Sequence, residues 1–353
     1  MKVLDTFAGA GGFSLGFHLT GQYDVIGAIE YDQWAADTFK FNHPESTVLV
    51  GDIQQYDEKF LLNTFKDKPD IILGGPPCQG YSIANRKAGD PADPRNSLFK
   101  EFIRLGKIFD PKIMIMENVP NLIKAKTKDN ELVIDIIIQE LKNLGYNVYH
   151  TILSATDFGV PQIRKRLVVI ASKEPLEKND FQKYLRGKSK KAYNHVAMKH
   201  SKRMVERFES MSCGDSISDV PEHLRPIKRN GNGEFSEKLY DQNNRKMHPD
   251  RPCHTIAASF YANFVHPFKN RNFTPREGAR IQTFPDWYVF KGKPTVVSHK
   301  LLQREGREEE KHLCQYNQIG NAVPPFLARA IAENLFSQLS IKSQKECLFT
   351  ETI

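Results

Sequence analysis

The chain has 353 residues, of which 40% are hydrophobic and 26% are charged, and these values exclude a mostly disordered or collagen-like protein. The length exceeds the roughly 250 to 300 residues over which one hydrophobic core usually grows, so we expect two domains. No apolar run approaches the ~18 residues of a membrane span, and Asp5 interrupts any stretch of signal-peptide length, so we expect a cytoplasmic protein.

The positive charge is concentrated in the middle of the chain. Residues 1–172 hold 19 Lys and Arg against 21 Asp and Glu, residues 173–300 hold 25 against 14, and residues 301–353 hold 6 against 7. A net charge of +11 in the middle segment fits either a solvated lysine-rich surface or a polyanionic partner. Aromatic and histidine side chains among the cations favour nucleic acid, and they are His254, Phe260, Tyr261, Phe264 and His266.

The cysteines indicate a reducing compartment. Their number is odd, and they are scattered at positions 78, 213, 253, 314 and 347. Neither a disulfide framework nor a paired metal motif follows from this spacing, so we expect no metal site.

The first half of the chain alternates short apolar runs with helical patterns. The strand-like runs lie at 2–7, 23–30, 46–52, 70–75, 112–118, 147–153 and 166–172. Runs of Val, Ile, Leu and Met without polar alternation are typical of parallel strands that are covered on both faces. We therefore predict an α/β fold with a doubly wound, mostly parallel sheet.

The pattern dissolves after Ser172 into polar, Gly- and Asn-rich sequence with only short strand-like pieces. This predicts a second, smaller and irregular domain. Helices are expected at 275–284, which has Pro at its first turn, and at 324–336, and the tail from Ser337 is expected to be a frayed helix end.

The carboxyl ends of parallel strands are where ligands bind in such a sheet. The first strand-like run is followed by Gly9 and Gly11, and Glu30 ends the second run 19 residues after Gly11. A glycine turn with a carboxylate about 20 residues on can bind a nucleoside-containing cofactor, although it can also be only a tight turn. Ser14 stands where a dinucleotide-binding fingerprint has its third glycine.

The fourth and fifth strand ends carry reactive groups. Pro76 and Pro77 precede Cys78 in a stiff loop, where the thiol is either a nucleophile or a small residue buried in a turn. Glu117 and Asn118 end the fifth run, and Glu117 is either a catalytic acid or a structural ion-pair partner. A thiol and an acid at neighbouring strand ends favour covalent catalysis.

Eight sequence blocks, in order, resemble those of the cytosine-C5 DNA methyltransferases over nearly the whole chain, and in particular the bacterial type II modification methylases. They are FAGAGG from residue 7, IEYD from 29, GDI from 51, GGPPCQG from 74, ENV from 117, QIRKR from 162, REGARIQTFP from 276 and IGNAVPP from 319.

The resemblance implies a covalent mechanism on a cytosine flipped out of duplex DNA. Cys78 would add to C6, Glu117 would assist at N3, and Asn118 would shape the turn beside it. Arg164 and Arg166 would orient the glutamate and hold the flipped base.

The resemblance also implies S-adenosylmethionine as the methyl donor. The implied cofactor-binding residues are Phe7, Gly9, Ala10, Gly11, Glu30, Asp52, Ile53, Pro77, Asn321 and Ala322. Because the last two come from the far end of the chain, residues 1–172 and 316–353 would form the catalytic domain. Residues 173–315 would be an inserted target-recognition domain with a hinge helix near 275–284.

Double-stranded DNA would be the partner of a monomeric enzyme, with a cognate restriction endonuclease as a genetic partner. The expected DNA-binding residues are Gln79, Ser82, Arg95, Arg251, Thr255, Lys269 and Arg271. Residues 81–96 resemble the family's loop that closes over the substrate, and residues 291–312 read as a surface elaboration.

Three other functions fit parts of the sequence. A tRNA cytosine methyltransferase shares the catalytic blocks, but its Cys-Phe-Thr signature is absent here. A catalytically inactive DNA-binding regulator would not need Cys78 and Glu117. A nicotinamide dehydrogenase is disfavoured by Ser14 and has no use for the Cys78 loop.

Overall fold

The computed structural model describes residues 1–77, 98–127, 129–177, 194–228, 233–236, 239, 243–258, 260–295 and 299–350. The chain separates into two compact units. Unit 1 comprises Met1–Val160, Arg164–Arg186 and Ala322–Ile353, and unit 2 comprises Pro161–Ile163 and Gly187–Asn321. Both ends of the chain thus build unit 1, and the divisions at 186/187 and 321/322 fall 14 and 6 residues after the expected ones at 172/173 and 315/316.

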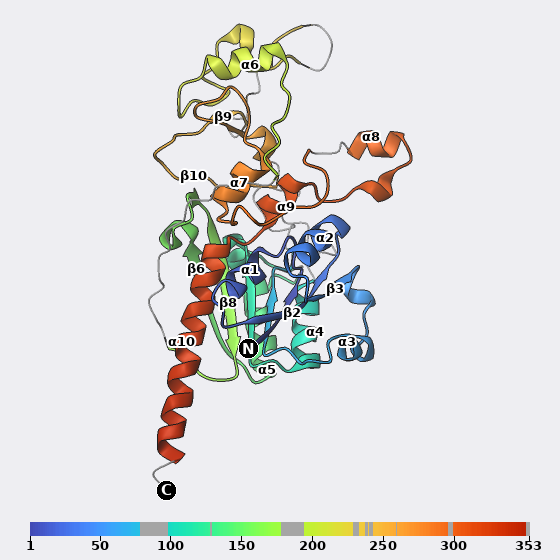
Figure 1. The fold of residues 1–353 in the computed structure, drawn as a ribbon, viewed down its shortest axis with the longest axis vertical. Helices are drawn as coiled ribbons and strands as arrows, with labels where there is room; N and C mark the ends of the chain where they lie inside the picture. The colour runs from blue at the N-terminus through green and yellow to red at the C-terminus, as the bar shows by residue number, and fades with distance from the viewer. Residues whose placement is uncertain are drawn as a thin grey trace. The chain divides into compact units, whose positions relative to one another are not determined.

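Unit 1 is built on a seven-stranded sheet in the order β3-β2-β1-β4-β5-β8-β6. Figure 1 labels its strands β2, β3, β6 and β8. Strands β1 to β5 are parallel, and β8 runs antiparallel to both of its neighbours, β5 and β6. The predicted mostly parallel, doubly wound sheet is confirmed. Its strands are β1 (Lys2–Thr6), β2 (Asp24–Glu30), β3 (Thr47–Val50), β4 (Ile71–Gly74), β5 (Ile113–Asn118), β6 (Asn147–Ser154) and β8 (Lys165–Ser172).

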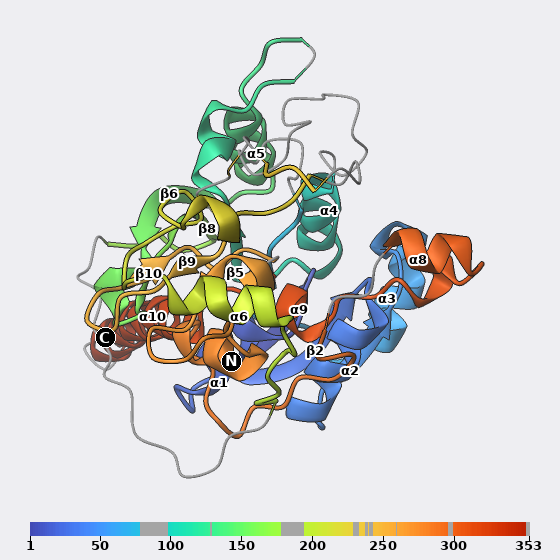
Figure 2. The same cartoon turned by 90° about the horizontal axis from the view of Figure 1, so that it is seen from above.

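Helices cover both faces of this sheet, as Figure 2 shows with α4 and α5 on one side and α1 and α10 on the other. Side chains from β4 and β5 alternate between the faces: Ile72 and Met114 point to one and Ile71 and Ile113 to the other. The helices are α1 (Gly12–His18), α2 (Gln33–Asn42), α3 (Glu58–Thr64), α4 (Phe99–Phe109), α5 (Val133–Asn143) and α10 (Pro325–Thr350).

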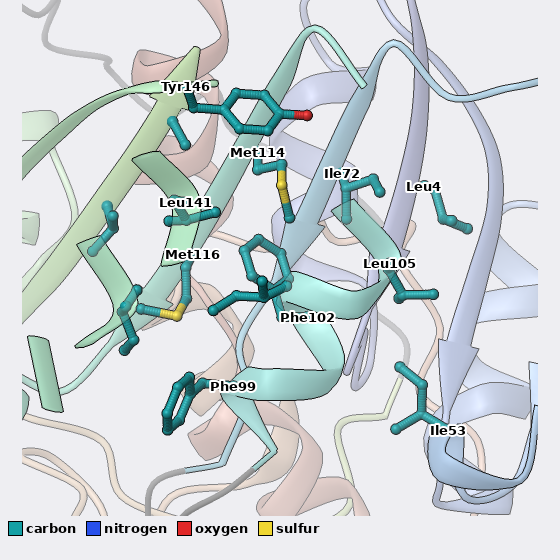
Figure 3. Packing of buried hydrophobic residues seen from close by; sticks show 14 of the residues in the cluster. Leu4, Ile53, Ile72, Phe99, Phe102, Leu105, Met114, Met116, Leu141 and Tyr146 are labelled. Carbon is teal, nitrogen blue, oxygen red and sulfur yellow. The ribbon is translucent and has the colours of Figure 1, made fainter. Parts of the chain in front are cut away.

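The larger core cluster lies between the sheet and helices α3, α4 and α5. Figure 3 shows Phe102 and Leu105 of α4 close to Ile72 and Met114 of the sheet. Among the described residues of this unit, short 3-10 turns also join elements, namely η1 (Ile53–Gln55), η4 (Pro120–Lys124) and η5 (Ala155–Phe158). The apolar pattern of β4, β5 and β8 is explained, because these inner strands are buried, whereas the edge strands β3 and β6 are largely exposed or half-buried.

The opposite face of the sheet is covered by α1 and by the returning C-terminal helix α10. A side-chain carbon added at Gly16 would lie 2.3 Å from Cβ of Ala328, so glycine permits the close approach of the two helices. The hydroxyl of Tyr23 donates a 2.7 Å hydrogen bond to the carbonyl of Ala332. The predicted helix at 324–336 is confirmed, and α10 continues beyond it to Thr350 through a tail without Gly or Pro, while fraying of its end stays a prediction.

Unit 2 has little regular structure, as predicted. Its core contains Phe208 of α6 and Met211 just after that helix, packed with residues from the following loops and with Val265. The predicted helix from Pro275 is confirmed, with a capping box between Thr274 and Glu277, although it ends at Ile281. The elements are β7 (Gln162–Ile163), α6 (Lys202–Glu209), η6 (Glu222–Leu224), β9 (Arg245–Lys246), β10 (Cys253–His254), η7 (Phe260–Ala262), β11 (Phe264–Val265), α7 (Pro275–Ile281), α8 (His299–Arg304), η8 (Glu308–Glu310) and α9 (Gln315–Asn321).

None of the helices that the structure describes combines the length and the apolar character needed to cross a membrane. The described residues likewise contain no group of three or more His, Cys, Asp or Glu side chains placed to hold a metal ion.

Candidate active site

The order of the sheet reverses between β1 and β4, and the chain segments after these strands leave the same edge. In the register, Thr6 of β1 lies beside Ile29 of β2 and Gly74 of β4, and Gly74 in turn lies beside Met116 of β5. A reversal of strand order opens a crevice at the carboxyl ends of the strands. The turn after β1, the loop after β4 and the end of β5 therefore share the place where such folds bind ligands.

The turn after β1 is a tight, left-handed loop that opens directly into α1. Phe7, Gly9 and Gly11 have φ angles of 56°, 54° and 77°. Gly11 N–H donates to the carbonyl of Ala8, which closes the turn. A side-chain carbon at Gly9 would meet no atom within 4 Å, so the backbone there faces open space, whereas Ala10 is buried.

Glu30, at the end of β2, fastens this turn. Its Oε2 accepts a 2.7 Å hydrogen bond from Gly9 N–H and its Oε1 accepts a 2.9 Å bond from Asp32 N–H. Burial raises the pKa of Glu30, and the two backbone bonds oppose that shift. Each carboxylate oxygen can still accept a second hydrogen bond, so the side chain can also bind hydroxyl groups of a ligand.

Three other expected cofactor residues, Asp52, Ile53 and Pro77, follow the neighbouring strands β3 and β4. Asp52 caps the turn after β3, with Oδ1 accepting from Gln54 N–H at 3.0 Å, and Ile53 is buried in the core. Gly51 N–H donates to the carbonyl of Glu30 at 2.9 Å, which ties the end of β3 to the end of β2. Pro77 is half-buried at the end of the described loop after β4.

The two expected cofactor residues near the C-terminus fall on either side of a division. Ala322 begins the last segment of unit 1, while Asn321 ends α9 in unit 2 and is exposed.

Glu117 forms a mostly buried ion pair with Arg166. Oε1 of Glu117, on β5, lies 2.6 Å from Nε of Arg166, on the adjacent antiparallel strand β8, and the side chains are only 11% and 13% exposed. The second oxygen, Oε2, lies 3.8 Å from the position of a side-chain carbon on Gly75. One carboxylate oxygen is thus held by the guanidinium while the other faces the start of the loop after β4.

Asn118 connects the ends of β4 and β5. Its Nδ2 donates a 3.0 Å hydrogen bond to the carbonyl of Pro76, and its Oδ1 accepts from Val119 N–H at 2.8 Å. The amide therefore fixes Pro76, two residues before Cys78 in the chain, relative to Glu117.

Arg164 is almost fully buried and supports the returning C-terminal segment. Its guanidinium donates a 3.1 Å hydrogen bond to the carbonyl of Ala322. Burial lowers the pKa of Arg164 well below its usual value, Arg166 lowers it further, and Glu117 opposes the shift. Arg164 and Arg166 thus differ: the structure shows Arg166 paired with the carboxylate and Arg164 bound to the backbone.

Four of the expected site residues lie outside the described residues. They are Cys78, Gln79, Ser82 and Arg95, and residues 81–96, expected to close over the substrate, lie there as well.

The expected DNA contacts in unit 2 have different environments. Arg251 and Lys269 are exposed, and Thr255 is exposed with its hydroxyl donating to the carbonyl of Ile163. Arg271 forms two hydrogen bonds with the carboxylate of Glu277, at 2.8 and 2.7 Å, and only 14% of its side chain is exposed. The guanidinium of Arg271 is engaged inside unit 2, which favours a structural role for it.

Residues 291–312 contain α8 and η8 and are largely exposed where they are described. Arg307 pairs with Glu310 at 2.6 Å and with Glu305 at 2.8 Å, so part of the acidic run is neutralised within the segment.

Two residues near the carboxyl ends of the parallel strands, which we call the active edge of the sheet, were not singled out from the sequence. Tyr31 follows Glu30 and has 76% of its surface exposed, which offers an aromatic face beside the glycine turn. Asp5, on β1, is 1% exposed and accepts hydrogen bonds from the hydroxyl and N–H of Ser14, at 2.6 and 3.3 Å. A charged residue inside an otherwise apolar strand was the available signal for Asp5.

The fold and the strand-end groups define a Rossmann-like methyltransferase domain, and comparisons with known proteins specify the family. The family model for C-5 cytosine-specific DNA methylases matches residues 1–337. The type II methyltransferase M.DdeI of Desulfomicrobium norvegicum is 43% identical over 380 aligned positions, covering 95% of this chain and 88% of that protein. The type II methyltransferase M1.HphI of Haemophilus parahaemolyticus is 37% identical, covering 94% and 86%.

A solved structure of similar fold is a prophage-encoded protein of E. coli titled as a DNA modification methyltransferase. It has a TM-score of 0.68 and 23% identity, and the match covers 96% of this chain and 99% of that one. The chain belongs to the C-5 cytosine-specific DNA methylases. It is accordingly a DNA cytosine-5 methyltransferase.

Proposed function

We propose that this enzyme methylates C5 of one cytosine within a specific duplex DNA sequence, with S-adenosylmethionine as the methyl donor and Cys78 as the nucleophile. The type II names of its relatives support sequence-specific modification. We further propose that it is a cytoplasmic monomer that protects DNA from a cognate restriction endonuclease.

The residues at the ends of β1, β2 and β3 fit this cofactor. The open space at Gly9 admits a ligand close to the backbone, and Glu30 has lone pairs left for ribose hydroxyls. Asp52 and the exposed ring of Tyr31 would hold the adenine, together with Phe7. When bound, S-adenosylmethionine supplies an electrophilic methyl group on sulfur.

The protein's own groups would prepare the cytosine. The thiolate of Cys78 forms a bond to C6, and the electron pair displaced from the C5–C6 double bond makes C5 nucleophilic. Glu117 holds a proton at N3 through Oε2, the oxygen that faces the loop after β4, while Arg166 fixes Oε1. After the methyl group has bonded to C5, loss of the C5 proton restores the double bond and expels the thiolate.

The cytosine must leave the duplex for these contacts, at a cost of about a few kcal/mol that other DNA contacts offset. Unit 2 contains most of the segment with net charge +11, and its exposed Arg251 and Lys269 suit phosphate binding.

The observation that carries the proposal is the placement of Glu117, paired with Arg166 and fixed by Asn118 to the loop that leads into Cys78. Methylation sequencing of DNA from cells that express the protein should first identify the target site. A duplex with 5-fluorocytosine at that target should then form a denaturation-resistant adduct with the wild type in the presence of S-adenosylmethionine, because fluorine replaces the proton that must be lost.

The matched variants are Cys78→Ser and Cys213→Ser, the second removing an exposed thiol in unit 2. The adduct should disappear in the first variant and persist in the second. An equal yield of adduct with Cys78→Ser would reject the assignment of the nucleophile.

A further inference from the structure

A buried acid that the proposed chemistry leaves unused lies on the central strand β1. Asp5 has Ala28 of β2 and Leu73 of β4 as its register partners, and 1% of its surface is exposed. Placing a carboxyl group among apolar strands is unfavourable unless hydrogen bonds compensate for the lost solvation. A carboxyl group at this position therefore needs a specific hydrogen-bond partner.

That partner is the first turn of α1. The residue that precedes α1 is Gly11, which has no side chain to cap the helix. Oδ2 of Asp5 accepts the N–H of Ser14 at 3.3 Å and its hydroxyl at 2.6 Å. Asp5 therefore supplies from the strand the cap that the glycine cannot provide.

The Phe7–Gly11 turn is consequently fixed at two points. Asp5 and Ser14 bracket it where it leaves β1 and enters α1, and Glu30 holds Gly9 N–H at 2.7 Å from the neighbouring strand. Three residues in this turn have left-handed backbone angles, and for Phe7 this conformation is unfavourable, so the surrounding contacts must impose it.

We propose that Asp5 is a positioning residue for cofactor binding, and that the Asp5–Ser14 pair holds the Phe7–Gly11 turn in the conformation that receives S-adenosylmethionine. This inference rests on the proposed function of the turn. Ser14, which stands at the place of a dinucleotide fingerprint's third glycine, provides the hydroxyl of the pair.

Asp5 is the member of the pair that titrates, and its pKa lies within the physiological pH range. Burial raises the pKa of Asp5 to about 7, the bonds from Ser14 oppose the shift, and Glu30 on β2 adds to it through charge repulsion. Ser14, on α1, is uncharged, and Leu73 is the register partner on β4. The ionised carboxylate accepts both bonds from Ser14 more strongly than the protonated acid does.

The test is calorimetric binding of S-adenosylhomocysteine, without DNA, at pH 6, 7 and 8. If the ionised form is the competent one, the affinity of the wild type should rise about tenfold from pH 6 to pH 8, because the ionised fraction rises from about one tenth to about nine tenths. Asp5→Asn keeps an acceptor for Ser14 and should bind with an affinity within about threefold of the wild type at pH 7, without this pH dependence.

Ser14→Ala should weaken binding about tenfold and raise KM for S-adenosylmethionine while kcat at saturating cofactor changes little. Ser172→Ala is the matched control, since Ser172 is equally buried but ends β8 at the opposite edge of the sheet. Glu30→Gln separates the titration of Glu30 from that of Asp5. Circular dichroism and the melting temperature verify that each variant is folded.

The outcomes distinguish the positioning role of the Asp5–Ser14 pair from the proposed cofactor site itself. If the wild type binds the nucleoside, Glu30→Gln weakens that binding, and Ser14→Ala matches the wild type at every pH, the positioning role is rejected and the proposed cofactor site stands. If the wild type does not bind, or Glu30→Gln binds unchanged, both are rejected.

Discussion

The Glu117–Arg166 pair allows the buried electrostatics of the site to be measured as a free energy. Its atoms lie 2.6 Å apart and the side chains are 11% and 13% exposed. Removing one member of a buried pair leaves an uncompensated charge, so Arg166→Met should lower the free energy of unfolding by about 3 kcal/mol or more. Glu117→Gln keeps an acceptor for the guanidinium and should cost less, about 1 to 2 kcal/mol.

The double variant replaces both charges, so it should lose less than the sum of the single variants by about 2 to 3 kcal/mol. The chain has two tryptophans, Trp34 in unit 1 and Trp287 in unit 2, and in a Trp287→Phe background urea unfolding followed by fluorescence reports unit 1. The more exposed pair of Lys112 with Asp70, at 2.8 Å with side chains 70% and 26% exposed, is the control and should show a coupling below about 1 kcal/mol. Equal coupling energies for the two pairs would refute the argument that burial makes the Glu117 contact strong.

Three further predictions test other parts of the structure. Gly16→Ala should destabilise unit 1 by about 1 to 3 kcal/mol, since the added carbon would lie 2.3 Å from a side-chain atom of α10, and an unchanged melting temperature would contradict that contact. Asp5→Asn should change the pH dependence of stability. The native Asp5, whose pKa burial raises to about 7, keeps a proton that the unfolded chain has released above pH 3.8, so wild-type stability should fall relative to the variant by roughly 1 kcal/mol per pH unit between pH 4 and 7. Parallel stability curves would exclude this shift. Arg251→Ala and Lys269→Ala should each reduce the slope of log K for DNA against log salt by about one, whereas Arg271→Ala should lower the melting temperature of unit 2. A loss of DNA affinity in Arg271→Ala at unchanged stability would show that its pairing with Glu277 does not keep it from DNA.

The sheet was predictable because burial on both faces leaves a direct trace in the sequence. The inner strands β4, β5 and β8 are rich in Val, Ile, Leu and Met, whereas the edge strand β6 carries several polar residues and is mostly exposed. The seven predicted runs contain the seven strands except at a few end residues. The reversed direction of β8 was not predictable, because a buried strand has the same composition in either direction. That reversal brings Arg166 beside Glu117, so the sequence named both residues without showing which atoms meet.

Two residues had partners that the sequence did not reveal, because side-chain partners are set by tertiary contacts. Arg271 stands among aromatic residues in a basic segment and resembles a DNA contact, yet Glu277 six residues later accepts two hydrogen bonds from it. A six-residue separation is not a spacing at which side chains meet along a helix. Asp5 was overlooked as a site residue for the same reason, since its partner Ser14 lies beyond the whole glycine turn.

The buried acids near the strand ends have two kinds of environment. Asp5 and Glu30 lie at the turn proposed to bind S-adenosylmethionine, and Glu117 lies where the cytosine is proposed to bind. Burial raises the pKa of both Asp5 and Glu30, which flank the glycine turn and whose charges repel each other. Glu117, at the end of β5, instead has the guanidinium of Arg166 against one of its oxygens. A cationic ligand at the turn would relieve the repulsion between Asp5 and Glu30 and favour their ionised forms, so its binding is coupled to proton release. Where the cytosine would bind, no ligand charge is needed to balance the carboxylate of Glu117, because Arg166 already supplies a cation. The position of this carboxylate is therefore set before any substrate arrives.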